Sequence, residues 1–168
     1  MTPFQIERQK YQPRFPRVCE NMTNVTVRTL GALEPEVDSS QKKTLKEIFS
    51  HTYGQPMIEF VDCEQKNEIK PLKIGVVLSG GQDPGGHNVI CGIGDGLWNF
   101  SKESKLVGFC DGPNGILENN TKELTSDVLN AYRNTGGFDL LGSGRTKIES
   151  TEQFKKCKDT LEANALDA

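Results

Sequence analysis

Short apolar runs alternate with helix-compatible segments along the second half of the chain. Three runs have the length and apolar content of buried strands, and each is followed by a glycine-rich turn. They are Lys73–Leu78 (KIGVVL), Lys105–Cys110 (KLVGFC) and Phe138–Leu141 (FDLL). We expect three parallel strands, because each run is separated from the next by enough residues for a crossover helix.

Three stretches between and after these runs predict helices. The second and third carry apolar residues on one helical face, and the third opens with a capping box formed by Ser150 and Gln153. The first stretch is Asn88–Phe100. The second carries Leu124, Val128 and Tyr132 on one face and is expected to stop at Gly136 and Gly137. The third carries Phe154, Cys157, Leu161 and Ala165 on one face. The βαβαβα order predicts the α/β class, with a three-layer parallel sheet. We expect this sheet to be incomplete, because the chain stops after a helix where the next strand would start.

Residues 1–70 are more polar than the rest and are punctuated by prolines. Within them we expect one helix over Ser39–His51, with Ser40 as its N-cap, and one short strand over Met57–Val61. The sequence therefore predicts two parts. Residues 1–70 form an irregular N-terminal extension, and residues 71–168 form the first part of an α/β domain.

Charge and cysteine content exclude several classes of protein. With 20 basic and 23 acidic residues the formal net charge is −3, whereas nucleic-acid binders usually carry a basic surplus. No apolar run approaches the roughly 20 residues that cross a bilayer, and we expect no secretory signal. The five cysteines include no C-x-x-C pair, which disfavours a disulfide framework and a zinc site. We expect a cytoplasmic protein without nucleic-acid or membrane partners.

Two glycine-rich turns, Ser79–Asn88 and Gly142–Lys147, follow the first and third expected strands. Ligands of open α/β sheets bind beyond the carboxyl ends of the strands, and glycines let backbone N–H groups approach an anion. The second turn adds Arg145, which can hold phosphate oxygens through two hydrogen bonds, and Lys147, a looser point charge. These residues predict a phosphate-binding site.

The common nucleotide motifs are missing. No Gly-Lys pair exists for a Walker A loop, and the glycines of Gly92–Gly96 break the G-x-G-x-x-G spacing. The alternative interpretation is that the glycines serve only tight turns and close helix packing. We favour that interpretation for Gly92–Gly96.

Three segments resemble the phosphofructokinase family, in its pyrophosphate-dependent, long-chain form of plants and protists. They are GGQDPGGHNVI (Gly80–Ile90), GFDLLGSGRTKIES (Gly137–Ser150) and ERQKYQPRFP (Glu7–Pro16), which is similar to the lead-in of the long form. The resemblance covers nearly the whole chain. Asp83 departs from the family pattern, which more often has a small residue before this proline.

The resemblance implies phosphoryl transfer from pyrophosphate to the 1-hydroxyl of fructose 6-phosphate, with Mg²⁺, by an oligomer of like or unlike subunits in glycolysis. Gly81 would place its backbone N–H against pyrophosphate, Arg145 would hold its charge, and Gly80 would support the turn. Lys147 and Gly144 are further candidates for phosphate contact or support.

Two functional segments of the family have no counterpart in these residues. One is a Gly-Gly-Asp-Asp segment that helps to bind the metal and distinguishes pyrophosphate from ATP, and the other is a Thr-x-Asp segment with the catalytic base. The resemblance therefore implies a fragment with part of a donor site, no catalytic residue, no metal ligand and no activity alone. An ATP-dependent phosphofructokinase and a non-catalytic regulatory subunit stay open as alternatives.

The resemblance also bears on regulation. Bacterial ATP-dependent relatives carry two arginines in the first helix that hold an effector phosphate, and the equivalent positions are Cys91 and Asp95. The resemblance implies that this allosteric site is lost.

Overall fold

The structure of the chain, a computed structural model, describes residues 2–20, 24–32, 34, 36–64, 66, 68–135 and 138–168, the side chains at 18, 19 and 138 excepted. It divides into two compact units: the residues up to Arg14 together with Ile69–Ala168, and Phe15–Glu68. The predicted division between an N-terminal extension, residues 1–70, and the first part of an α/β domain, residues 71–168, stays a prediction.

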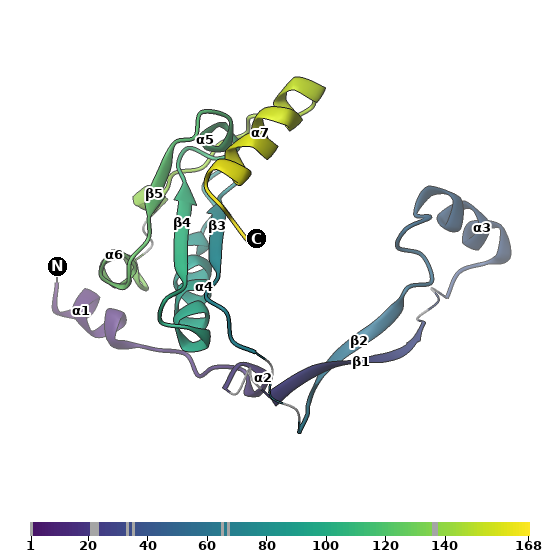
Figure 1. Cartoon of the computed structure of the whole chain (residues 1–168), viewed down its shortest axis with the longest axis horizontal. Coiled ribbons are helices and arrows are strands. Elements are labelled where there is room, and N and C mark those ends of the chain that lie inside the picture. The colour runs from purple at the N-terminus through teal and green to yellow at the C-terminus, as the bar shows by residue number, and fades with distance from the viewer. Residues whose placement is uncertain are drawn as a thin grey trace. The chain divides into compact units, whose positions relative to one another are not determined.

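A three-stranded sheet lies at the centre of the first unit (Figure 1). Strands β3 (Lys73–Val77) and β4 (Lys105–Phe109) are parallel, and β5 (Thr121–Glu123) runs antiparallel along the other edge of β4. The first two strands confirm two of the three expected runs. Together with the helices around them, this mixed sheet places the chain in the α/β class.

The prediction of a third strand at Phe138–Leu141 is wrong. Phe138–Leu140 forms the short 3-10 helix η2, and an isolated parallel bridge between Ser79 and Gly144 follows it. The physical reason lies at both edges of the parallel pair. Strand β5 pairs along the outer edge of β4, and Asp167 and Ala168 bond to Lys73 and Gly75 along the outer edge of β3. Leu140 and Leu141 are nevertheless buried, as their apolar character predicts.

The described residues of the first unit include the α-helices α1 (Pro3–Lys10), α4 (Gly86–Phe100), α5 (Pro113–Leu117), α6 (Ser126–Tyr132) and α7 (Thr151–Ala163). Helices α4, α6 and α7 confirm the three expected ones, and the capping box of α7 is present. Leu124 lies before α6 and Ala165 after α7, so neither belongs to the helix in which it was expected. The predicted stop of α6 at Gly136 and Gly137 lies outside the described residues. Helices α1 and α5 were not expected, because neither carries an apolar stripe.

The core of the first unit lies between the sheet, α4 and α6. Its buried members are Ile90, Cys91, Leu97, Leu106, Leu124, Leu129, Leu140 and Leu141. Helices α4 and α6 approach closely at Gly94, where an added methyl group would lie 2.5 Å from Cδ1 of Leu129. This contact confirms, for Gly94, the expectation that the glycines of Gly92–Gly96 serve helix packing. Gly92 and Gly96 meet no such neighbour.

The predicted apolar face of α7 is only partly used. Phe154 is 58% exposed and Leu161 is 40% exposed. The last residues of the chain lie along β3: the Asp167 N–H donates to the Lys73 carbonyl, and the Gly75 N–H donates to the carbonyl of Ala168, both at 2.8 Å.

The second unit holds the helices α2 (Arg17–Glu20) and α3 (Ser39–Ile48) and an antiparallel pair, β1 (Val25–Ala32) and β2 (Pro56–Asp62). The extension is thus more regular than its composition predicts. The expected strand at Met57–Val61 is confirmed within β2. The predicted N-cap Ser40 is wrong: the Asp38 carboxylate caps α3, accepting from the N–H groups of Ser40 and Gln41 at 2.9 Å each.

No helix of the described ranges is long and apolar enough to span a membrane. Cys91, Cys110 and Cys157 are in the thiol form. The side chain of Cys19 lies outside the described residues.

Candidate functional site

The two glycine-rich turns meet at the carboxyl end of β3. Ser79 and Gly144 form the parallel bridge, and the N–H of Gly80 donates to the Gly144 carbonyl at 3.0 Å. The hydroxyl of Ser143 donates to the carbonyl of Gly81. The structure therefore brings together two segments that lie more than sixty residues apart in the sequence.

The Arg145 side chain lies over Gly81. A methyl group added at Gly81 would be 3.0 Å from Nη2 of Arg145, so this approach depends on the missing side chain. Arg145 is exposed, and among the described ion pairs none involves it. A guanidinium carries five N–H donors and binds oxyanions through two of them at once. An anion held by the Gly81 N–H would be within reach of these donors.

Lys147 stands apart from these contacts. Its side chain is 80% exposed, and its ammonium group lies 3.5 Å from a carboxylate oxygen of Glu149. An exposed pair at this distance contributes little to stability. The contacts that join Gly80, Gly81, Gly144 and Arg145 do not include Lys147.

A third loop, which follows β4, completes the backbone around Gly144. The N–H of Asp111 donates to the Leu141 carbonyl at 2.9 Å. Gly112 has a φ of +72°, and a methyl group on it would lie 2.3 Å from the Gly144 nitrogen. A methyl group on Gly144 would lie 2.5 Å from the Asp111 carbonyl oxygen. Gly144 is thus required for close backbone packing. Sequence reasoning missed this role, because the pattern of the third loop indicates only a turn.

Asp83 places a carboxylate within the first turn. Its φ is +42°, and its Oδ2 is buried without a hydrogen-bond partner. Its Oδ1 lies 3.1 Å from the position of a methyl group on Gly80. An unpaired buried oxygen is costly, so Asp83 brings both strain and negative charge to the turn.

Among the described residues, no group of three or more potential His, Cys, Asp or Glu ligands is found. Magnesium in phosphoryl-transfer sites usually binds through one or two carboxylates, together with waters and substrate phosphates. The unpaired Oδ2 of Asp83 is a single carboxylate oxygen.

His87 opens helix α4 directly after the first turn and is 6% exposed. Burial lowers its pKa, and the nearby positive charge of Arg8 lowers the pKa further. The imidazole is therefore neutral at pH 7, because its ordinary pKa of 6.5 already lies below that value. A neutral His87 adds no positive charge to the anion site.

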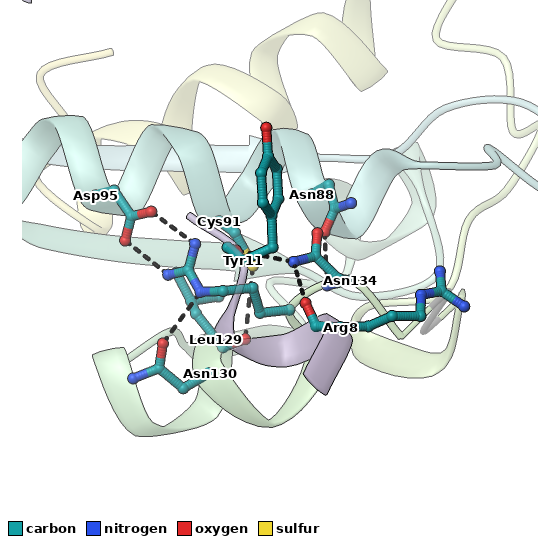
Figure 2. A network of polar contacts seen from close by, with 9 residues as sticks. Arg8, Tyr11, Asn88, Cys91, Asp95, Leu129, Asn130 and Asn134 are labelled. Atoms are coloured by element: carbon teal, nitrogen blue, oxygen red, sulfur yellow. Dashed lines mark hydrogen bonds and ion pairs between the residues drawn. The ribbon is translucent and has the colours of Figure 1, made fainter. Parts of the chain in front are cut away.

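The two positions that the resemblance equates with effector arginines, Cys91 and Asp95, have contacts inside the fold. The Cys91 thiol is 2% exposed and donates to the Leu129 carbonyl at 3.5 Å. Asp95 pairs with Arg133 through two hydrogen bonds of 2.7 Å each (Figure 2). Burial raises the pKa of Cys91, and the hydrogen bonds that Arg133 donates to Asp95 raise the pKa of Arg133. This face of α4 thus holds a buried thiol and a neutralised carboxylate.

Comparison with known proteins identifies the family. No protein-family model matches the chain. It is 43% identical over 173 residues to the pyrophosphate–fructose 6-phosphate 1-phosphotransferase of Treponema pallidum, covering 98% of this chain and 30% of that protein. It is 47% identical over 136 residues to the pyrophosphate–fructose 6-phosphate 1-phosphotransferase subunit beta 2 of Arabidopsis thaliana, covering 79% of this chain and 24% of that protein.

The chain belongs to the pyrophosphate-dependent phosphofructokinase family. It spans less than a third of the length of these relatives. The solved structure of Pichia pastoris phosphofructokinase in the T-state has a TM-score of 0.47 at 17% identity, covering 66% of this chain and 13% of that one. A structural similarity this low does not bear on the fold.

Proposed function

We propose that this chain provides part of the pyrophosphate site of an enzyme that transfers a phosphoryl group from pyrophosphate to fructose 6-phosphate, giving fructose 1,6-bisphosphate. The observation that carries the proposal is the approach of the Arg145 guanidinium to Gly81, at the junction of the two glycine-rich turns. The names of the relatives support the substrates. Phosphoryl transfer depends mostly on positioning and on charge stabilisation, which fixed N–H groups and an arginine supply.

The residues of the site have different roles. The N–H of Gly80 is occupied by the Gly144 carbonyl, so Gly80 supports the turn and Gly81 offers its N–H to the anion. Arg145 neutralises the charge of the bound pyrophosphate. Gly144 acts through packing, and Lys147 contributes at most a distant positive charge.

Three features of the enzyme are expected to lie outside the described residues. Magnesium neutralises phosphate oxygens when it is bound, and its ligands would come from other segments. The catalytic base and the sugar-phosphate site would come from other segments or a neighbouring subunit. The name "subunit beta 2" of one relative supports an oligomer of like or unlike subunits, and the thiols of Cys91, Cys110 and Cys157 support a cytoplasmic location.

The 168-residue chain by itself is expected to have no phosphotransferase activity. Phosphoryl transfer needs metal-neutralised oxygens, an acceptor held in line and a group that takes the hydroxyl proton. The chain supplies the donor-side contacts. An assay of homogeneous chain of verified mass with Mg²⁺, pyrophosphate and fructose 6-phosphate should show no turnover, and measurable turnover would place the catalytic base within these residues.

Kinetics of a full-length phosphotransferase that contains this chain test the proposal. Arg145→Ala should lower kcat/KM by roughly 10²-fold, because a preorganised charge is lost. Arg145→Lys should restore part of the loss, since an ammonium group lacks the planar pair of donors. Lys147→Ala is the matched control and should stay within a few-fold of the wild type. Unchanged kinetics of Arg145→Ala would reject the proposal, as would ATP serving as the preferred donor or an inactive wild-type subunit.

A further inference from the structure

The last residues of α6 form a cluster of polar contacts that reach two other helices (Figure 2). Arg133 caps the helix and is 6% exposed, and its ion pair with Asp95 fixes this end of α6 to α4. The next residue, Asn134, has a φ of +57°. Asparagine is one of the few residues that tolerate this left-handed conformation at a helix end. The side chain of Asn134 is thereby turned towards α1.

All three N–H donors of Asn134 have partners on other elements. Its backbone N–H donates to Oδ1 of Asn88 at 2.9 Å. Its Nδ2 donates to the carbonyl of Arg8 at 2.8 Å and to that of Tyr11 at 3.0 Å. The Arg8 carbonyl also accepts from the Tyr11 N–H at 3.2 Å, so the Asn134 amide adds a second donor there and supplies a donor to the Tyr11 carbonyl from outside α1.

Helix α1 has little else to hold it in place. None of its residues is buried, and Phe4 is 70% exposed. The amide of Gln9 donates to the Ala131 carbonyl at 3.1 Å, which adds one further bond to α6. A helix of eight residues is marginal in water on its own. The polar contacts from Asn134 and Gln9 therefore decide whether α1 stays on this face.

The other partner of Asn134 is Asn88, the last residue of the first glycine-rich turn. Asn88 is in the first turn of α4, and its N–H donates to the Gly85 carbonyl at 2.9 Å. Gly86 closes the preceding turn by donating to the Asp83 carbonyl at 2.9 Å. A contact that fixes Asn88 therefore restrains the segment immediately behind the first glycine-rich turn.

We propose that Asn134 is a positioning residue that fastens α1 and the beginning of α4 to the end of α6, and so holds the first glycine-rich turn in its anion-binding form. Its link to pyrophosphate rests on the proposed function, whereas the fastening itself stands on the contacts alone. The turn is lined by glycines and carries a strained, unpaired Asp83. Such a turn needs restraint from its surroundings, and α6 supplies that restraint through Asn134.

Two substitutions of Asn134 distinguish the role of its side chain from the role of its backbone N–H. Asn134→Gly keeps the left-handed conformation and the N–H that reaches Asn88, and removes the amide. Asn134→Asp keeps the side-chain shape and turns the donor group into a carboxylate that faces two carbonyl oxygens. Asn130→Ala is the matched control on the same helix: it removes an amide that accepts from Nε of Arg133 at 3.3 Å and leaves the α1 contacts intact.

Amide hydrogen exchange of the 168-residue chain is the primary measurement. In both Asn134 variants, the amides of Ile6 and Tyr11 should exchange about 3- to 10-fold faster, the range of one lost hydrogen bond. Asn88→Ala removes the acceptor of the Asn134 N–H, so in that variant the amides of Gly86 and Asn88 should exchange at least about 3-fold faster. Asn130→Ala should match the wild type at both pairs of amides. Wild-type exchange at Ile6 and Tyr11 in Asn134→Asp, or at Gly86 and Asn88 in Asn88→Ala, would overturn the proposal.

A titration with millimolar pyrophosphate adds the functional readout. Asn88→Ala, which removes the acceptor of the Asn134 N–H, should bind pyrophosphate about 3-fold or more weakly than the wild type, because one hydrogen bond that restrains the turn is lost. Equal affinity despite faster exchange would overturn the link to the turn. A wild-type chain that binds no pyrophosphate would reject the proposed function, and the exchange rates would still decide whether Asn134 fastens the three helices.

Discussion

Arg133 and Asp95 form a two-fold hydrogen-bonded ion pair, with 2.7 Å from Nη1 to Oδ2 and 2.7 Å from Nη2 to Oδ1. The Arg133 side chain is 7% exposed and that of Asp95 is 24% exposed. The pair joins the end of α6 to the middle of α4. A carboxylate at a position where the resemblance indicates a lost effector arginine is thus part of the fold.

Removing one partner of this pair should be costly. Asp95→Ala leaves the Arg133 guanidinium buried without a counter-charge, so the free energy of unfolding should fall by about 3 kcal/mol. The double substitution Asp95→Leu with Arg133→Met should lie within about 1 kcal/mol of the wild type, since packed apolar residues replace buried ion pairs well. Urea denaturation measures both.

The exposed pair of Lys155 and Asp159 on α7 is the control. Their side chains are 77% and 57% exposed, so Asp159→Ala should change the free energy of unfolding by less than about 0.5 kcal/mol. If Asp95→Ala has an equally small effect, the Arg133 pair does not hold α4 and α6 together.

The glycines of α4 should respond differently to the same substitution. Gly94→Ala would bring a methyl group to 2.5 Å from Leu129, and this overpacking should lower the free energy of unfolding by about 1–3 kcal/mol. Gly92→Ala meets nothing within 4 Å and should stabilise by about 0.5–1 kcal/mol through helix propensity. Thermal unfolding of the two variants should therefore move in opposite directions. If the melting temperatures of both variants shift in the same direction, the packing described for α4 is contradicted.

Most of the α/β pattern could be predicted from the sequence. The runs at β3 and β4 and the helix α4 carry strong apolar patterns, and the capping box of Ser150 and Gln153 marks the start of α7. Strand β5 could not be predicted, because Thr121–Glu123 is polar and its pairing is decided by the free edge of β4. The other edge of the sheet, along β3, is occupied by Asp167 and Ala168, which leaves no edge for a strand at Phe138–Leu141.

The residue types of the candidate site could be predicted from the sequence, whereas most of the contacts between them could not. The glycines and Arg145 were found from their positions after apolar runs. The packing of Gly144 on Asp111 and Gly112 was not, because a close approach between two backbones leaves no apolar period in either segment. The contacts of Asn134 likewise join residues about 46 and 126 positions apart, and no local pattern encodes them.

Acid should destabilise the chain through His87. Burial first, and the charge of Arg8 second, lower its pKa in the folded state, so the unfolded chain binds the proton more tightly. The unfolded state then holds more protons as pH falls below about 6.5, and stability decreases. The contribution is complete above about pH 7 and is lost as pH falls through the lowered folded-state pKa.

Denaturation between pH 7.5 and 5 tests this dependence. His87→Gln should flatten the fall in the free energy of unfolding, whereas His51→Gln, in the other unit, should retain it. An equal slope in the wild type and His87→Gln would show that another group controls the acid response.

The central claim is that the two glycine-rich turns and Arg145 together bind pyrophosphate. The most direct measurement is a titration of the isotopically labelled 168-residue chain with pyrophosphate, followed by the NMR signals of Gly81 and the Arg145 side chain. We expect both signals to shift together, with weak affinity in the millimolar range, and we expect Arg145→Ala to abolish the shift at Gly81 while Lys147→Ala preserves it. Signals of Gly81 that stay in place up to saturating pyrophosphate, or that shift equally in Arg145→Ala, would contradict the account.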